Sequence, residues 1–403
     1  MTKKIFVIST FPIKNAQHGG QKRLKAIVDS YNANGFHVRH VAVFYKGYYS
    51  DYSESDIPLG SRYDPIVSQS PYTSDIVSGE AINLDLVVKK KLTKELLDFD
   101  PDIIDIHQPF IYLGLKSILN EIGHHYKLIY NSYNIEAPMK ESILKGANLP
   151  IKDITICIEK IKNVEMDLTK NSDLSVGCTK QDVAVLKSYG AKTTVLAVNG
   201  INPIKTSKKE LDYWKKKLVS RNIYRLIMFI GSAHPPNWTG FYNMVGKGLG
   251  FIPYDTRICL AGSIGDYFKN DIKDDNRSIY DATFWRRAFT VGRINDEGLG
   301  ALIKLSDIII LPITEGGGSN LKTAEAILAN KKVVTTQYGL RSFEWYNTFP
   351  NLWIANDSEN FRRSINDALV APFRQRTDQE NHKAASVTWE HSLKELINAV
   401  KNL

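Results

Sequence analysis

The sequence predicts an α/β protein with two open, parallel sheets that carry helices on both faces. Short β-branched runs alternate with longer amphipathic stretches along the chain, which is typical of βα units. The chain has 403 residues, more than one hydrophobic core usually serves. We therefore expect two domains, with ligands bound beyond the carboxyl ends of the strands.

Each half of the chain contributes short apolar runs that predict strands. In the first half they are residues 5–9, 38–44, 103–107, 128–131, 174–176 and 194–198. In the second half they are residues 226–230, 257–261, 289–291, 308–311, 332–335 and 352–355. Amphipathic patterns predict helices near residues 21–34, 84–97, 159–169, 180–189, 361–369 and 389–403.

A turn at Asn199-Gly200 and the polar run that follows it mark the domain boundary. We expect an N-terminal domain of residues 1–205 and a C-terminal domain of residues 206–385. The last helix, within residues 386–403, is expected to pack back on the N-terminal domain.

The composition is that of a globular protein, with 43% hydrophobic and 24% charged residues. No apolar run approaches the roughly 18 residues of a membrane-spanning helix, so a cytoplasmic protein is expected. The three cysteines, Cys157, Cys178 and Cys259, are odd in number, widely spaced and without metal-ligand spacing. They indicate reduced thiols and no metal site.

The net charge of +9 suits an acidic partner, which could be a nucleic acid, an anionic lipid or a phosphorylated substrate. No nucleic-acid-binding motif is present, so no nucleic-acid partner is expected. A helix at residues 87–99 would place Lys89, Lys90, Lys91 and Lys94 beside an apolar stripe. Two interpretations of that helix stay open: a solvated face, or peripheral contact with an anionic membrane at its inner face.

The segment 308–330, IIILPITEGGGSNLKTAEAILAN, changes from strand to loop to helix within a few residues. Consecutive glycines let the backbone approach an anion, and the N-terminal end of the helix near Ser319 favours a diphosphate. Lys322 would add a cation, and Glu325 could accept hydrogen bonds from ribose hydroxyls. A flexible loop before an ordinary amphipathic helix is the alternative interpretation.

With this segment, the sequence resembles the retaining GT-B glycosyltransferases, especially glycosyltransferase family 4, over most of the chain. Shorter matches are DIIILP (307–312), VVTT (333–336), FIGSAHPPN (229–237), LAGS (260–263), VGRI (291–294) and VNGIN (198–202). The resemblance implies a GT-B fold, in which two Rossmann-like open parallel-sheet domains face each other across a cleft.

The resemblance also implies roles for individual residues. The donor-binding residues would be Gly19, Gly20, Gly231, Arg293, Gly316, Gly317, Gly318, Ser319, Asn320 and Glu325. The catalytic residues would be His107, Glu315 and Lys322. Many members of the family carry two glutamates eight positions apart, whereas Glu315 stands ten positions before Glu325, so the role of Glu315 stays open.

Some of these residues also have a structural interpretation. His107 ends an apolar strand, where similar enzymes have a histidine that touches the donor sugar, but a strand-end histidine can equally be a core residue. Gly19-Gly20 could face the cleft or form a tight turn. Asn134 and Glu136, which follow the next strand, could reach the cleft or cap a helix.

The reaction implied is transfer of a sugar from a nucleotide-diphosphate donor, UDP- or GDP-linked, with retention and without a metal or cofactor. The acceptor would be a glycan, a lipid-linked saccharide or a protein, as in bacterial polysaccharide biosynthesis. An inverting transferase would need a carboxylate base, for which Glu136 is the candidate. The sequence is also compatible with a sugar-nucleotide epimerase and with a non-catalytic nucleotide-sugar-binding subunit.

Overall fold

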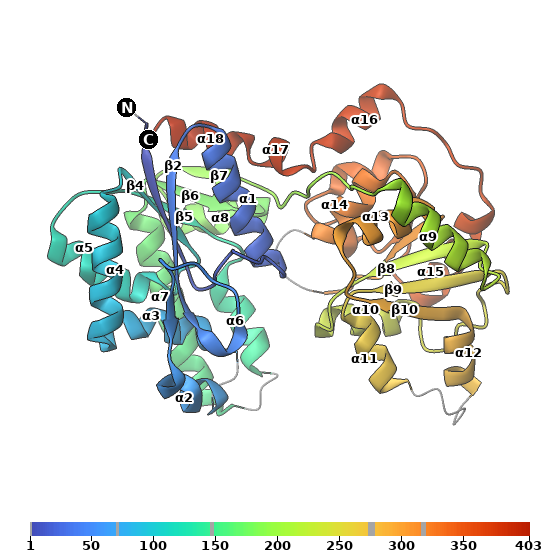
Figure 1. Ribbon diagram of the computed structural model, residues 1–403, viewed down its shortest axis with the longest axis horizontal. Helices are drawn as coiled ribbons and strands as arrows, with labels where there is room; N and C mark the ends of the chain where they lie inside the picture. The colour runs from blue at the N-terminus through green and yellow to red at the C-terminus, as the bar shows by residue number, and fades with distance from the viewer. Residues whose placement is uncertain (1, 70–71, 146–148, 273–278, 316–319) are drawn as a thin grey trace. The chain divides into compact units, whose positions relative to one another are not determined.

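The computed structural model describes residues 2–69, 72–145, 149–272, 279–315 and 320–403. The chain forms two compact units (Figure 1). Unit 1 contains residues Met1–Asn199 and Ser392–Leu403, and unit 2 contains Gly200–His391. Each unit holds one parallel sheet with helices packed on it, so the predicted α/β class with two parallel sheets is confirmed.

The sheet of unit 1 has the strand order β3-β2-β1-β4-β5-β6-β7, and all neighbours pair in parallel. Its strands are β1 (Lys4–Ser9), β2 (His37–Tyr45), β3 (Ile57–Leu59), β4 (Ile103–His107), β5 (Lys127–Asn131), β6 (Leu174–Gly177) and β7 (Thr194–Leu196). The central strands are buried on both faces, which explains their continuous apolar runs. The core of the unit packs around Phe6, Ile8, Ile104 and Ile106.

The helices of unit 1 flank this sheet (Figure 1). They are α1 (Gly19–Ala33), α2 (Asp64–Gln69), α3 (Ser74–Leu84), α4 (Leu86–Phe99), α5 (Tyr112–Ile122), α6 (Glu136–Lys145), α7 (Ile151–Asn171), α8 (Lys180–Ser188) and α18 (Lys394–Lys401), with the 3-10 turns η1 (Lys46–Tyr48) and η2 (Ser61–Tyr63). The C-terminal helix α18, red in Figure 1, packs beside β7. Near it, Lys3 Nζ donates a 2.9 Å hydrogen bond to the Lys401 carbonyl oxygen.

The helix predicted near residues 84–97 is α4, Leu86–Phe99, and a separate helix, α3, precedes it. The side chain of Asp85 accepts hydrogen bonds from Val87 N and Val88 N, so it caps α4, and α3 ends immediately before it. Helix α3 packs closely on the connection after β4, because a Cβ atom at Gly79 would lie 1.9 Å from the Phe110 carbonyl oxygen.

Most of the apolar stripe of the basic helix is buried inside unit 1, and Leu97 is exposed. Val88, Leu92 and Leu96 of α4 are buried in the core. Lys89 pairs with Glu121, and Lys91 donates hydrogen bonds to the carbonyl oxygens of two residues, Glu54 at 3.3 Å and Asp56 at 2.7 Å. Most of the stripe and two of the four lysines therefore make contacts within unit 1.

The sheet of unit 2 has the order β10-β9-β8-β11-β12-β13, again parallel throughout. Its strands are β8 (Arg225–Ile230), β9 (Thr256–Ala261), β10 (Ala288–Gly292), β11 (Ile308–Leu311), β12 (Lys332–Thr335) and β13 (Leu352–Ile354). Its helices are α9 (Lys208–Val219), α10 (Pro235–Met244), α11 (Ile264–Asp271), α12 (Ile279–Arg287), α13 (Asp296–Leu305), α14 (Leu321–Ala329), α15 (Ser358–Val370), α16 (Asp378–Ala385) and α17 (Trp389–Ser392), with η3 (Tyr338–Leu340) and η4 (Glu344–Thr348).

The boundary between the units falls after Asn199, because the residues that follow are bonded within unit 2. Ile201 N donates to the Val387 carbonyl oxygen at 2.9 Å, and Trp389 N donates to the Ile201 carbonyl oxygen at 3.1 Å. A Cβ atom at Gly300 would lie 2.1 Å from the carbonyl oxygen of Lys205, so residues up to 205 pack on α13.

Candidate functional site

In each sheet, the order in which the chain adds strands reverses direction at one place, the switch point. In unit 1 this switch point lies between β1 and β4, and in unit 2 it lies between β8 and β11. Ligands of open α/β sheets bind outside the carboxyl ends of the strands at such points. The residues that follow these four strands are therefore the first candidates for a site.

The switch point of unit 2 holds Lys322. This residue lies in the first turn of α14, whose N-cap is Asn320; the Asn320 side chain accepts a hydrogen bond from Lys322 N at 3.2 Å. The ammonium group donates to Asn237 Oδ1, on the helix that follows β8. Loss of hydration lowers the pKa of Lys322 to about 8, although the charge of Glu325 acts in the opposite direction.

Asn237 links this cation to the end of β8. Its side-chain nitrogen donates hydrogen bonds to Ser232 O at 2.8 Å and Ser232 Oγ at 3.1 Å. Next to it, Ala233 N donates to Ser263 Oγ, after β9, at 3.0 Å. Asn237 thus ties a cation in the first turn of α14 to the end of β8, and a cation beside a helix N-terminus is suited to an anion.

The other predicted residues of unit 2 follow strands of the same sheet or lie in α14. Glu315 is exposed, and Thr239 Oγ1 donates to its carboxylate at 2.9 Å. Glu325 is one helical turn from Lys322. Gly231 is buried at the end of β8, and Arg293 is exposed after β10. Gly316, Gly317, Gly318 and Ser319 lie outside the described residues.

His107 in unit 1 is fully buried, with both ring nitrogens engaged. Its Nε2 lies 3.1 Å from Asp105 Oδ2, and its Nδ1 lies 2.8 Å from Tyr133 Oη. Since a carboxylate only accepts, Nε2 carries the hydrogen and Nδ1 accepts from the tyrosine. Asp105 also accepts from Tyr31 Oη at 2.9 Å and Asn131 Nδ2 at 2.7 Å, whereas Asn131 Oδ1 has no partner in the described part of the chain.

Gln108, which the sequence did not single out, bridges the switch point of unit 1. Its Oε1 accepts from Thr10 Oγ1 after β1 at 3.1 Å, and its Nε2 donates to Glu136 Oε1 at 3.3 Å. Its backbone N donates to the Asn131 carbonyl oxygen at 3.1 Å. The residue is partly exposed and has a left-handed φ of 65°, although it is not a glycine.

Glu136 is fully buried at the start of α6. Its backbone N donates to the Glu165 carboxyl group at 3.1 Å, and Tyr130 Oη donates to the same group at 2.7 Å. Burial, followed by the charges of Glu165 and Asp75, raises the pKa of Glu136 to about 8, against the opposing effects of Lys140 and of the Gln108 hydrogen bond. Its Oε2 has no partner in the described part of the chain.

The loop with Gly19 and Gly20 begins α1. His18 is the N-cap, and its side chain accepts from Gln21 N in a capping box that Gln21 completes. The Gln21 side chain also donates to the Pro12 carbonyl oxygen at 2.7 Å. Gly20 lies in the first turn of α1 and packs closely on the preceding loop, because a Cβ atom there would lie 3.2 Å from the Phe11 ring.

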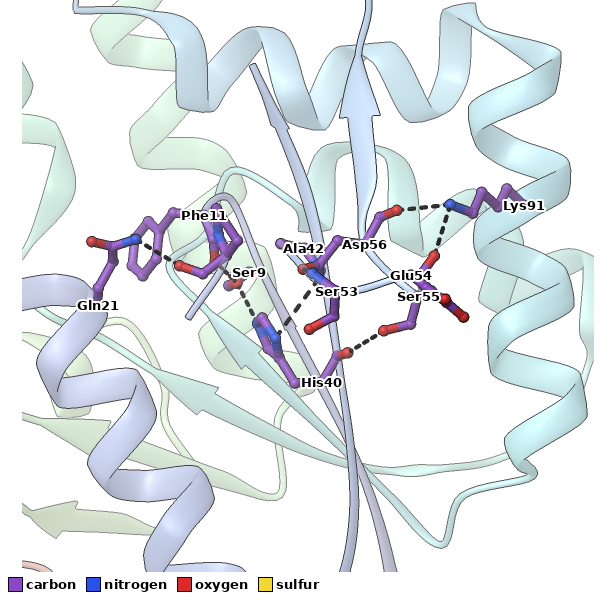
Figure 2. A network of polar contacts seen from close by, with 11 residues as sticks. Ser9, Phe11, Gln21, His40, Ala42, Ser53, Glu54, Ser55, Asp56 and Lys91 are labelled. Carbon is purple, nitrogen blue, oxygen red and sulfur yellow. Dashed lines mark hydrogen bonds and ion pairs between the residues drawn. The ribbon is translucent and has the colours of Figure 1, made fainter. Parts of the chain in front are cut away.

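Ser9, His40 and Asp56 lie in the order of a nucleophilic triad, but their hydrogen bonds exclude that role (Figure 2). Ser9 Oγ donates its hydrogen to the Phe11 carbonyl oxygen at 2.8 Å, so His40 Nε2, 2.9 Å away, must act as the donor. His40 Nδ1 lies 3.9 Å from Asp56 Oδ1, which accepts from Ala42 N at 2.8 Å. This buried network joins the β1–α1 loop to the segment before β3.

No protein-family model and no curated protein sequence matches the chain. The fold is similar to that of sucrose-phosphate synthase from Thermosynechococcus elongatus, with a TM-score of 0.70, 14% identity, and coverage of 99% of this chain and 98% of that one. It is also similar to a glycosyltransferase from Rickettsia africae (TM-score 0.67, 15% identity, coverage 100% and 98%). Anabaena HepE in complex with UDP gives a TM-score of 0.63 at 14% identity, with 100% of both chains covered. The chain therefore has the fold of GT-B glycosyltransferases.

Among the described residues, no helix is long and apolar enough to cross a membrane. No group of three or more His, Cys, Asp or Glu side chains in the same residues is placed to hold a metal ion.

Proposed function

We propose that the protein is a glycosyltransferase that takes a nucleotide-diphosphate sugar at the β8–β11 switch point of unit 2. One observation carries the proposal: Lys322 is held by Asn237 beside the N-terminus of α14, where a diphosphate would meet a cation and the positive end of the helix dipole. The full-length similarity to glycosyltransferases, one of them solved with UDP, supports it.

In this proposal, the chemistry at the donor is electrostatic. Breaking the bond between sugar and diphosphate places negative charge on the leaving oxygen, and Lys322 with the α14 N-terminus would stabilise it without a metal. Glu325 would accept hydrogen bonds from the ribose. Arg293 and Glu315 would contact the phosphate and the sugar. An activity that survives excess chelator is expected.

We propose retention of anomeric configuration. An inverting reaction needs a base in contact with the acceptor hydroxyl, and complete burial makes Glu136 a poor candidate for that role. The anomer of the product, read by NMR, tests this point: an inverted product would contradict it.

A binding experiment tests the donor site. UDP, GDP and their sugars are screened with the purified chain by thermal shift, because a ligand of the folded state raises Tm. For the nucleotide that binds, Lys322→Met is expected to weaken affinity about 100-fold, since a charge-assisted contact contributes up to about 3 kcal/mol. Glu325→Ala is expected to weaken it about tenfold.

Lys331→Met is the matched control. Lys331 lies between α14 and β12, and its ammonium group donates to the Lys304 carbonyl oxygen at 2.6 Å. It therefore lies before a strand and not after the carboxyl end of one. This variant should bind the nucleotide within about twofold of wild type. Equal losses in Lys322→Met and Lys331→Met, or no nucleotide binding by wild type, would contradict the proposed site.

A further inference from the structure

The β1–β4 switch point of unit 1 is the other sheet edge at which a substrate can bind. This inference rests on the proposed function, because a transferase needs a second substrate, and the donor is assigned to unit 2. The residue that spans this edge is Gln108, whose amide meets Thr10 on one side and Glu136 on the other.

The backbone of Gln108 is held in a conformation that local preferences oppose. Its φ of 65° is left-handed, and Pro109 follows it, which further restricts its backbone. Such conformations persist only when the surroundings enforce them, and they cluster at functional sites. Here a hydrogen bond from Gln108 N to the Asn131 carbonyl oxygen enforces it.

The contacts leave part of the amide available. An amide group has two N–H donors and an oxygen with two lone pairs. In the described residues, Gln108 Oε1 receives one hydrogen bond from Thr10, and Nε2 gives one to Glu136. Since Gln108 is partly exposed, one donor and one acceptor remain for a ligand.

We propose that Gln108 binds a hydroxyl group of an uncharged sugar acceptor at the β1–β4 switch point, and that Thr10 and Glu136 fix the orientation of its amide. A hydroxyl group donates and accepts, so it matches an amide that offers one group of each kind. Glu136 is a positioning residue, because its buried carboxyl group acts on the acceptor only through Gln108.

The surroundings favour an uncharged ligand. Thr10 and the Asn131 carbonyl are neutral partners of Gln108. The raised pKa of Glu136, about 8, keeps its carboxyl group largely protonated at neutral pH. Among the described residues, no fixed charge therefore contacts the amide, in contrast to Lys322 in unit 2.

Isotope-edited NMR tests the contact directly. The side-chain amide signal of Gln108 is assigned by its loss in Gln108→Gly. Wild type is first saturated with the nucleotide that binds. It is then titrated with methyl glucoside, methyl galactoside, methyl mannoside and inorganic phosphate. At least one glycoside should shift the signal, and phosphate should not. A shift with phosphate alone, or with none of these probes, would overturn the proposal.

Substitutions separate function from folding. Glycine accepts a left-handed backbone, so Gln108→Gly should stay folded and bind nucleotide as wild type does while weakening glycoside binding or its use as acceptor at least tenfold. Asn222→Gly makes the same backbone change at φ 54° in unit 2 and should leave glycoside binding unchanged. Gln108→Asn, which also tolerates this conformation, provides a second variant if the glycine variant is unstable.

Glu136 is tested by rescue. Glu136→Gln keeps an oxygen that accepts from Gln108 Nε2 and should bind glycosides as wild type does, whereas Glu136→Ala should lose about tenfold while still binding nucleotide. Equal glycoside binding by both Glu136 variants would overturn the positioning role. If wild type binds no nucleotide sugar, the proposed function fails; if it binds one but glycosides do not affect Gln108, this inference alone fails.

Discussion

The two switch points occupy equivalent places in their sheets but differ in chemistry. In unit 1, Thr10 and Gln108 join the strand ends through a neutral hydroxyl–amide contact. In unit 2, Asn237 and Lys322 join them through an ammonium group that has lost part of its hydration. The same topology thus presents a neutral polar surface on one sheet and a cation on the other, which suits a hydroxyl-bearing substrate and a diphosphate respectively.

His40 of unit 1 is also uncharged at neutral pH, and its protonation in acid should destabilise the fold. Burial, and secondarily the charge of His107, lowers the pKa of His40 to about 3. Between that value and the unfolded value of 6.5, only the unfolded chain binds the proton, so stability falls as the pH falls. The loss should reach at most about 5 kcal/mol, at about 1.4 kcal/mol for each pKa unit.

Urea unfolding at several pH values, followed by circular dichroism, measures this effect. His40→Gln removes the titrating group and should have a smaller loss of stability between about pH 6.5 and about pH 4 than wild type. All six tryptophans lie in unit 2, so their fluorescence reports on the unit that lacks His40. An acid dependence that is identical in wild type and His40→Gln would contradict this assignment.

The two units also share a packing feature at the second strand of each switch point. A Cβ atom at Gly79 of α3 would lie 1.9 Å from the Phe110 carbonyl oxygen, and one at Gly240 of α10 would lie 2.1 Å from that of Pro312. Gly79→Ala and Gly240→Ala should each cost about 2 kcal/mol of unfolding free energy, because neither backbone can give way cheaply.

Gly60→Ala in unit 1 and Gly250→Ala in unit 2 are matched controls. No described atom lies within 4 Å of a Cβ atom at either position, so changes should stay within about 0.5 kcal/mol in urea unfolding. Losses as large in the controls as in Gly79→Ala and Gly240→Ala would show that close packing is not the cause.

The strands were predictable because their signal is local. Every predicted strand is present, since short β-branched runs of buried parallel strands stand out from their flanks. The edge strand β3 was missed, because Ile57–Leu59 has only three residues and contains Pro58. Residues 45–82 have no clear periodicity in the sequence, yet they contain β3, α2 and most of α3.

The site was predictable only in part, for a similar reason. Lys322 follows from its position after a strand and a glycine loop, both of which are adjacent in sequence. Asn237 is bonded to Lys322, 85 residues away, and the partners of Gln108 are at least 23 residues away, which no local pattern reveals. His107 was identified as a strand-end residue, but its hydrogen bonds with Asp105 and Tyr133 were not.

The pH dependence of nucleotide binding gives the finest test of the contrast between the switch points. Lys322 has a pKa of about 8, so below that value it is already charged and binds a diphosphate without taking up a proton. Above it, binding must first protonate the amine, and affinity falls as the pH rises. With phosphate groups fully ionised, UDP affinity should fall about tenfold between about pH 7 and about pH 9, or about 1.4 kcal/mol.

Calorimetry in buffers of different ionisation enthalpy should detect proton uptake on UDP binding at about pH 9 and almost none at about pH 7. Lys322→Met should bind weakly with a flat pH profile, and Lys331→Met should keep the wild-type profile. Methyl glycoside binding at Gln108 should lack this dependence on Lys322, because its contacts lie in the other unit. If Lys322→Met keeps the wild-type pH profile, the titrating cation is another residue. The proposed electrostatic difference between the two switch points would then be wrong.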